Sequence, residues 1–322
     1  MSSPASDPAD LETLQELIER FDVASALGAR VDRLLFASGN LSRVYGIETS
    51  AGERVVLKVR ADSVRLDAVA RVQSLLHRAG QPLPEPLAGP WRRDGVAISA
   101  ERLVPGGSAR GPAGDAARDF AEVFFALLTA APPGEDFPEL REDAPPWVNW
   151  SHTEDTVWPA RDTPGAEIRG PGPDDVDDAG RAAAEVLRGL DRPRVIAHAD
   201  FEDQNVRWRD GRIHVVHDWD SLALLPECAA VGSTAAAWPA GVVQWCATVE
   251  QSEDFLTAYE LVRGRPFDDA ERRAAWAARR LGGAALWHRS FNARKDAADG
   301  GGMQLDLFRR DARRLRALAG VG

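Results

Sequence analysis

The stretch from Arg194 to Ser221 constrains the fold more than any other part of this sequence. It begins with a short apolar strand at 195–197 and continues into a polar loop. A two-strand ribbon follows, because Asp210-Gly211 between two runs of strand-forming residues is a hairpin signal. The second strand of the ribbon, 213–216, again ends in polar residues. Two strand ends therefore bring four polar side chains into one neighbourhood: His198, Asp200, Asn205 and Asp218.

Length and charge limit what this chain can be. Its 322 residues, of which 44% are apolar, predict a folded protein with room for two domains or lobes. The formal net charge of −11 argues against a nucleic acid or an anionic membrane as a general partner.

Cysteine usage and the N-terminus indicate a cytoplasmic protein. The two cysteines, Cys228 and Cys246, form no CxxC pair, so neither a disulfide framework nor a zinc-thiolate site is expected. Residues 1–10 lack the apolar region of a secretory signal. No apolar run approaches the roughly 20 residues that span a bilayer. The sequence does not indicate an oligomeric state.

The first third of the chain alternates strand-forming residues with turns. Five strands are predicted, at 34–36, 44–47, 55–59, 87–91 and 96–102. An amphipathic helix is expected before them, from Leu11 to near Gly28, and another between the third and fourth strands, from Ser63 to Arg78.

Strand signals become rare after the segment Leu103-Val104-Pro105-Gly106-Gly107, which is typical of a hinge. Helices are predicted at 115–131, 174–190, 252–263, 268–293 and 303–319. The expected fold is therefore α+β. It consists of a disordered lead at 1–10, a small β-rich N-terminal lobe at 11–104 with an antiparallel sheet, and a larger, mostly helical lobe at 105–322.

The loop after the first strand of the ribbon region reads H-x-D-x-x-x-x-N, and phosphoryl transfer gives a reason for each residue type. A carboxylate, here Asp200, would accept the proton of the attacking hydroxyl. An amide and a second carboxylate, Asn205 and Asp218, would hold Mg²⁺, because that ion prefers hard oxygen ligands. The alternative is a solvated loop with an aspartate cap, because short motifs also arise by chance.

Two features of the N-terminal lobe suit a nucleotide. Lys58 interrupts the apolar strand 55–59, where its ammonium would lie on the phosphates or, alternatively, on a solvated sheet face. The preceding turn can present backbone N–H groups to phosphates, although an ordinary hairpin explains it equally well. Its candidate residues are Ser38, Gly39, Asn40 and Ser42. No P-loop and no G-x-G-x-x-G motif is present.

The order of these parts resembles the aminoglycoside phosphotransferase and choline kinase-like family, a branch of the protein-kinase-like fold. The loop at His198 is similar to the family's H-G-D-x-x-x-x-N, with Ala199 in place of glycine. The segment His217-Asp218-Trp219-Asp220 is similar to its I-D-W/F-[DE]. Val55–Val59, Gln81–Pro84 and Glu101–Gly106 are similar to its V-L-K strand, its P-V-P connector and its E-x-x-P-G hinge.

The resemblance implies a small-molecule kinase that uses ATP or GTP with Mg²⁺. By position it implies Asp200 as the base and Asn205 and Asp218 as the metal ligands. Lys58 would contact the phosphates, and the backbone of Glu101 and Leu103 would contact the adenine. Two further residues would support the site, His198 by bracing the loop and Asp220 by assisting metal or acceptor binding.

One departure from the family concerns the partner of Lys58. The family's helix glutamate would fall near Val69, yet 69–76 contains no acid. Asp67 is the nearest carboxylate in the helix, and two residues of helical rotation carry it away from that face. Two interpretations stay open: Asp67 substitutes through a shifted helix, or Lys58 lacks an acidic partner.

Two other classes of function are considered. A metal hydrolase would use a His/Asp cluster that includes His214 and His217, although three residues of strand direct these two to opposite faces. A non-catalytic nucleotide-binding pseudokinase would explain the missing helix glutamate. Turnover of ATP and zinc content discriminate among the three.

The acceptor is expected to be a small molecule with a hydroxyl group, and its identity is open. Acidic residues at 135–155 would attract a cationic acceptor such as an amino sugar, unless they form only a solvated surface. Tryptophans would line an acceptor pocket if they do not belong to the core. These are Trp147, Trp150, Trp158, Trp238 and Trp245.

Overall fold

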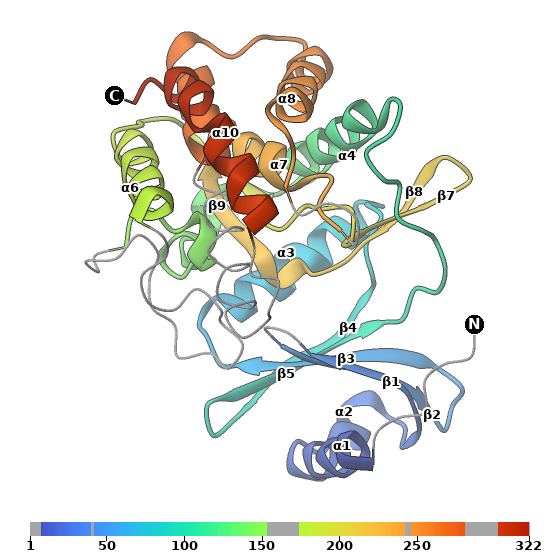
Figure 1. The fold of residues 1–322 in the computed structure, drawn as a ribbon. Coiled ribbons are helices and arrows are strands. Elements are labelled where there is room, and N and C mark those ends of the chain that lie inside the picture. The colour runs from blue at the N-terminus through green and yellow to red at the C-terminus, as the bar shows by residue number, and fades with distance from the viewer. Residues whose placement is uncertain (1–7, 40–41, 153–173, 242–245, 281–301, 322) are drawn as a thin grey trace. The chain divides into compact units, whose positions relative to one another are not determined.

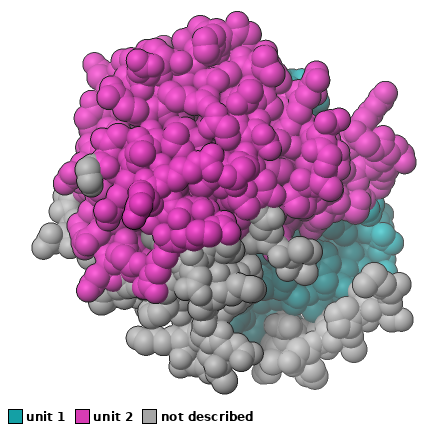
Figure 2. Space-filling model, turned by 45° about the horizontal axis from the view of Figure 1, so that its top comes forward, with its two compact units in different colours: residues 1–106, 163–165 teal, residues 107–162, 166–322 magenta. Residues whose placement is uncertain are grey.

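The computed structural model describes residues 8–39, 42–152, 174–241, 246–280 and 302–321 (Figure 1). Of these residues, those up to Gly106 form one compact unit, unit 1, and those from Gly107 onward form a second, unit 2 (Figure 2). Within the described parts, no helix has both the length and the apolar character needed to cross a bilayer.

Unit 1 is built on a five-stranded antiparallel sheet with the strand order β1-β2-β3-β5-β4. The strands are β1 (Val31–Gly39), β2 (Arg43–Thr49), β3 (Arg54–Ala61), β4 (Pro86–Arg93) and β5 (Val96–Arg102). Together with a helical second unit, this sheet confirms the predicted α+β class, and all five predicted strands are present.

The two faces of this sheet differ in chemistry because side chains alternate along each strand. One face is apolar and packs on Leu14 and Val23 of the two N-terminal helices. It consists of Tyr45, Ile47, Val55, Leu57, Ile98 and Ala100. The other face carries Lys58, with helix α3 (Arg65–Arg78) on that side of the sheet and α1 and α2 on the apolar side (Figure 1).

The N-terminal helix is divided, and this corrects the prediction of one helix ending near Gly28. The structure has α1 (Pro8–Arg20) and α2 (Val23–Leu27). Asp22 between them lies in the left-handed region, at φ 47°, which ends a helix and which aspartate tolerates better than most residues. Helix α1 also begins inside the lead predicted to be disordered, and residues 1–7 lie outside the described residues.

Unit 2 contains most of the helices and two small antiparallel sheets, β6–β9 and β7–β8. The helices are α4 (Ala116–Ala130), α5 (Glu139–Glu142), α6 (Asp174–Arg188), α7 (Glu227–Ala237), α8 (Val249–Arg263) and α10 (Gly302–Ala319). The strands are β6 (Arg194–His198), β7 (Val206–Arg209), β8 (Arg212–Val216) and β9 (Leu222–Pro226), and the 3-10 turns are η1 (Gly134–Asp136), η2 (Pro146–Val148) and η3 (Trp219–Ser221). Residues 269–280 are also helical, and the rest of the helix predicted at 268–293 lies outside the described residues.

Strand β9 and helix α7 were not predicted. Both are almost wholly buried, so neither shows the alternation or the helical period that a half-exposed element has. A side chain at Gly232 of α7 would stand 2.0 Å from the carbonyl oxygen of Ala275, so glycine lets this helix approach residues 269–280 closely. The β7–β8 hairpin does follow the prediction: Asp210 and Gly211 both have positive φ, as a two-residue hairpin turn requires.

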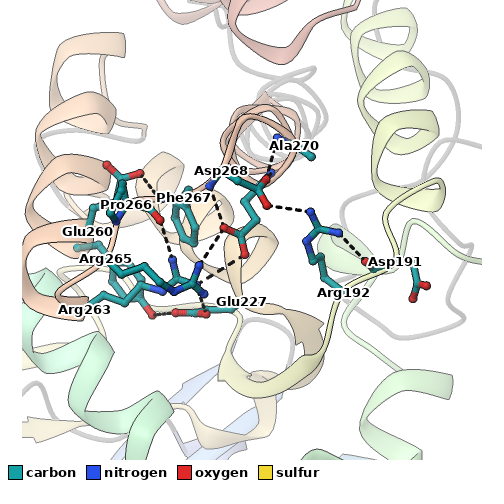
Figure 3. A network of polar contacts seen from close by, with 12 residues as sticks. Asp191, Arg192, Glu227, Glu260, Arg263, Arg265, Pro266, Phe267, Asp268 and Ala270 are labelled. Atoms are coloured by element: carbon teal, nitrogen blue, oxygen red, sulfur yellow. Dashed lines mark hydrogen bonds and ion pairs between the residues drawn. The ribbon is translucent and has the colours of Figure 1, made fainter.

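A charged network joins α7, α8 and the helix at 269–280 (Figure 3). Nη2 of Arg263 lies 2.7 Å from Glu227 Oε2 and 3.7 Å from Glu271 Oε1. Its guanidinium also stacks over the Phe267 ring, 4.5 Å from the centroid. The Tyr259 hydroxyl donates to Glu227 at 2.8 Å. Several acceptors thus hold one buried arginine.

Candidate active site

The polar loop of unit 2 starts at the end of a buried strand. Strand β6 ends at His198 and pairs with β9, and Val206 begins β7 directly after the loop. Phe201, 1% exposed, anchors the middle of the loop between Phe120 and Phe124 of α4, with ring centroids 5.8 Å and 5.1 Å away. The loop is therefore fixed at both ends and at its centre.

Asp200 and Asn205 contact each other within this loop. The Asn205 amide donates from Nδ2 to the Asp200 carbonyl at 2.9 Å and to Asp200 Oδ2 at 3.0 Å. This orientation turns the amide nitrogen to Asp200 and leaves Oδ1 of Asn205 as the atom that can serve a cation. Asn205 is 7% exposed, whereas Asp200 is half-buried. The donor set fits a hard cation such as Mg²⁺.

His198 links the loop to the end of β8. Its Nε2 lies 2.7 Å from the His217 carbonyl, and the Asp200 N–H donates to its Nδ1 at 3.3 Å. This pairing assigns the ring proton to Nε2, which donates to the His217 carbonyl, and the Ser221 hydroxyl also lies 3.2 Å from Nδ1. The ring is 3% exposed and packs edge-on against Trp219 at 5.3 Å. Such contacts suit a bracing role, which stays a prediction.

Asp218 follows β8 in an unusual backbone conformation. It lies in the left-handed region, at φ 61° and ψ 48°, which is uncommon for a residue other than glycine. Its carbonyl accepts from the Ser221 N–H at 3.2 Å and from the Ser221 hydroxyl at 2.9 Å. The N–H of the neighbouring His217 donates to the Asn205 carbonyl at 2.8 Å. A backbone bond thus joins the start of β7 to the end of β8, and Asp220 lies half-buried in η3.

Contacts made by Asp203 and by Trp147 support this loop and were not predicted from the sequence. The Asp203 carboxylate, on a residue 6% exposed, accepts from the Arg110 N–H at 2.7 Å and from the Gly111 N–H at 3.1 Å. The Trp147 indole donates to the Ala199 carbonyl at 2.9 Å. These contacts join segments more than 50 residues apart in sequence, so no local sequence pattern predicts them.

The hypothesis that tryptophans line an acceptor pocket is wrong for two of them. Trp150 and Trp238 are 3% and 1% exposed and belong to the core of unit 2. Trp147 is half-buried against the loop, as described above. Trp158 and Trp245 lie outside the described residues.

In unit 1, Lys58 has an acidic partner, and it is not the one considered from the sequence. Its ammonium lies 3.2 Å from Glu101 Oε1, and both side chains are less than a tenth exposed. Asp67 instead forms a bidentate pair with Arg92, at 2.8 and 3.2 Å. Both open interpretations were therefore wrong, because they considered only carboxylates of the helix.

The remaining nucleotide residues lie along β1, β2 and the end of β5. Ser38 and Gly39 end β1 opposite Val44 and Arg43 of β2, and Ser42 precedes β2. Asn40 lies outside the described residues. The Leu103 N–H donates to the Arg54 carbonyl at 3.0 Å, so a contact of Leu103 with a base would use its carbonyl.

Phe36 was not singled out in the sequence. Its ring lies over Gly46 so closely that a Cβ at Gly46 would stand 2.1 Å from it. Phe36, Gly46, Val56 and Glu101 are register partners across four strands, so their side-chain positions share the face that carries Lys58. A glycine within a strand signals such a close approach.

A hydrolase-type metal centre finds no support in the described part of the chain. Within it, no group of three or more His, Cys, Asp and Glu side chains is positioned to hold a metal ion. The polar set around Asn205 differs from such a centre because one of its oxygens comes from an amide.

Unit 1 has a five-stranded antiparallel sheet with a buried lysine, and the helical unit 2 has a strand, a loop and a hairpin that carry Asp200, Asn205 and Asp218. Together these features are typical of kinase-like phosphotransferases. The family comparison agrees: residues 32–266 match the model of the phosphotransferase enzyme family. The chain belongs to that family, and the resemblance found in its sequence is confirmed.

Solved structures with a similar fold are distant in sequence. Amicoumacin kinase hAmiN, solved with AMP-PNP, Ca²⁺ and Ami, is 13% identical, with 95% of each chain covered and a TM-score of 0.62. An aminoglycoside phosphotransferase from Alicyclobacillus acidocaldarius is 13% identical over 92% of this chain and 93% of that chain, with a TM-score of 0.52. A choline/ethanolamine kinase family protein from Mesorhizobium loti is 15% identical over 95% and 94%, with a TM-score of 0.51. These likenesses show the shared fold, and no curated protein sequence matches the chain.

Proposed function

We propose that this protein transfers the γ-phosphoryl group of ATP to a hydroxyl group of a small molecule. The observation that carries the proposal is the contact between Asn205 and Asp200, 3.0 Å from Nδ2 to Oδ2, on a loop tied to the Asp218 end of β8. In phosphoryl transfer the protein positions the reactants and stabilises charge, and this loop presents the residue types for both tasks.

Asp200 is the proposed base. The Asn205 amide holds its Oδ2 and so fixes the plane of the carboxylate. A carboxylate held in this way accepts the hydroxyl proton as the oxygen attacks phosphorus. The bond from the Asp200 N–H to His198 Nδ1 fixes the backbone of the same residue. His198 therefore acts on the base through the main chain.

Asn205 and Asp218 are the proposed ligands of a magnesium ion, through Oδ1 of the amide and through the carboxylate. The ion, when bound, would neutralise charge on the phosphate oxygens. The left-handed backbone of Asp218 and the two bonds to its carbonyl fix the direction in which its side chain leaves the chain. Asp220, two residues later, is proposed to assist metal or acceptor binding.

ATP is the proposed phosphate donor. Lys58 would contact its phosphates, and the end of β1 at Ser38 and Gly39 would offer backbone N–H groups. The similar amicoumacin kinase was solved with the ATP analogue AMP-PNP and a divalent cation, which supports this assignment. The pseudokinase alternative depended on a Lys58 without an acidic partner, and the structure shows that partner.

The test is a phosphate-transfer assay with ATP or GTP, Mg²⁺ and a panel of hydroxylated acceptors that includes amino sugars and amino alcohols. Replacing a general base costs about 10²- to 10⁴-fold in rate, so Asp200→Asn should lower kcat by that factor. Its binding of ATP should change little. The matched control is Asp210→Asn, because Asp210 lies in an exposed hairpin turn and asparagine tolerates its positive φ. A rate for Asp200→Asn equal to that of the wild-type protein would refute the assignment.

A further inference from the structure

The acidic partner of Lys58 lies on a strand, whereas the resemblance placed it on the following helix. The Lys58 ammonium and Glu101 Oε1 are 3.2 Å apart, and the residues are 5% and 6% exposed. Helix α3 contributes no carboxylate to this contact, since position 69 is valine and Asp67 is paired with Arg92.

The sheet register explains why Glu101 reaches Lys58. Lys58 of β3 stands directly opposite Ser99 of β5, and Glu101 is two residues farther along β5. Residues in such a diagonal relation share a face and lie within reach of long side chains. The pair therefore follows from strand pairing alone and does not depend on the position of a helix.

Helix α3 contributes an amide instead of a charge. Gln73 lies one turn after Val69, so the two positions share a side of the helix. Its Nε2 donates to Glu101 Oε2 at 3.1 Å and is 3.4 Å from the Pro84 carbonyl. Each carboxylate oxygen of Glu101 thus has one donor, Lys58 on Oε1 and Gln73 on Oε2.

In this chain of contacts each residue orients the next, from Gln73 to Glu101 to Lys58. A buried carboxylate needs donors on both oxygens, and Gln73 supplies the second one without competing for the charge of the lysine. The amide orients Glu101, and Glu101 in turn places the Lys58 ammonium. All three side chains belong to residues that are no more than 7% exposed, so solvent cannot replace a lost partner easily.

We propose that Glu101 is the positioning residue of Lys58 for binding the nucleotide phosphates, and that Gln73 orients Glu101 for this task. The pair takes the place of the lysine–helix glutamate pair. The inference rests on the proposed function, because it assigns Lys58 to the phosphates of ATP. A purely structural pair would have the same geometry, so the test must separate phosphate binding from folding.

The experiment compares the affinity for ATP with the affinity for adenosine by calorimetry in the presence of Mg²⁺. Supporting residues of a functional group typically contribute 10- to 100-fold, so Glu101→Gln should weaken ATP binding by about that factor. Adenosine has no phosphates, so its affinity should stay within about twofold. Glu101→Asp should fall between the wild-type protein and Glu101→Gln, and Gln73→Leu should weaken ATP binding by roughly the lower limit of that range.

Glu85→Gln is the matched control. Glu85 pairs with Arg102, the residue next to Glu101, through a bond of 2.7 Å from the Arg102 Nε, and its side chain is 41% exposed. The substitution makes the same change of charge just before the adjacent strand β4 and should leave both affinities unchanged. If Glu101→Gln does not fold, Glu101→Asp and Gln73→Leu provide the test. In both variants the ratio of ATP affinity to adenosine affinity should be lower than in the wild-type protein.

An equal loss of affinity for ATP and adenosine, or no loss for either, would overturn the inference. Suppose that the wild-type protein binds ATP and transfers phosphate, and that Glu101→Gln has the wild-type ratio of ATP affinity to adenosine affinity. In that case only the role of Glu101 is refuted. If the wild-type protein binds no ATP, the proposed function falls as well, and with it the role of Glu101.

Discussion

Both units bury a cation against carboxylates, and the two arrangements differ in what they leave for a ligand. In unit 2 the Arg263 guanidinium lies between Glu227 and Glu271 and over Phe267, with 5% of its side chain exposed (Figure 3). In unit 1 the Lys58 ammonium, 7% exposed, pairs with Glu101. A planar guanidinium makes several fixed contacts at once, whereas an ammonium is a compact charge whose three donors can rotate toward a new acceptor. Similar burial thus serves cohesion in one unit and, we propose, phosphate binding in the other.

The largest effect is expected from breaking the network of unit 2. Arg263→Met leaves Glu227 and Glu271 without their buried cation, and loss of one partner from such a pair costs about 3–5 kcal/mol. The free energy of unfolding from urea titration should fall by this amount, and ATP affinity of the folded protein should stay the same. Arg265→Met is the control, since Arg265 also contacts Glu271, at 3.5 Å, but its side chain is 60% exposed. Its loss should stay below about 1 kcal/mol, and equal losses in the two variants would contradict this interpretation of the network.

The pair in unit 1 should respond differently when both partners are replaced. Lys58→Met and Glu101→Met should each destabilise the protein by about 3 kcal/mol, because each removes the opposite charge of this buried pair. The double variant should recover to within about 1 kcal/mol of the wild-type protein, since apolar residues of similar volume often replace a buried pair at no cost. It should nevertheless fail to prefer ATP over adenosine. The comparison fails if the double variant loses as much stability as the sum of the single variants.

Alkaline pH gives a smaller effect, which is expected from two buried groups of unit 2. Burial, together with the nearby Glu271, raises the pKa of the Cys228 thiol to about 12, and burial and Glu227 raise the pKa of the Tyr259 hydroxyl. In the unfolded chain these groups titrate near their ordinary values of about 8.5 and 10. The unfolded state therefore loses protons first as pH rises, so stability present below about pH 8.5 declines toward pH 12. For Cys228 the loss by pH 10 is on the order of 2 kcal/mol.

Urea unfolding at pH 8 and at pH 10 measures this decline. The variant Cys228→Ala/Tyr259→Phe lacks both groups and should lose less stability over the same interval. An identical decline in the variant and the wild-type protein would show that other groups cause it.

The sequence predicted what local patterns encode. The apolar strand at 195–197, the hairpin turn at Asp210-Gly211 and the five strands of unit 1 all follow from alternation and turn residues. The same patterns explain why Asp200, Asn205 and Asp218 lie on strand ends that backbone bonds join. A motif that depends on spacing within one supersecondary unit can be found without knowledge of the tertiary structure.

What the sequence did not reveal depends on register and on long-range contact. The pair of Lys58 and Glu101 requires that β5 lie beside β3 with Ser99 opposite Lys58, although 41 residues separate Lys58 from Ser99 (99 − 58). Gln73 was not considered because the resemblance directed attention to acids in the helix. Asp203 binds the backbone of Arg110 and Gly111, and backbone donors leave no trace in a sequence. Side chains that act through main-chain groups are therefore the hardest to predict.

The strand location of Glu101 also bears on how such an enzyme can be controlled. When a helix carries the counter-ion of the lysine, moving the helix separates the two charges and turns the site off. Lys58 and Glu101 stand on hydrogen-bonded neighbouring strands of one sheet, so a movement of α3 does not carry their backbones apart. Helix α3 can alter only a neutral hydrogen bond to Glu101. A movement of α3 would therefore change the orientation of Glu101 through Gln73 and would leave the strand positions of both charges in place.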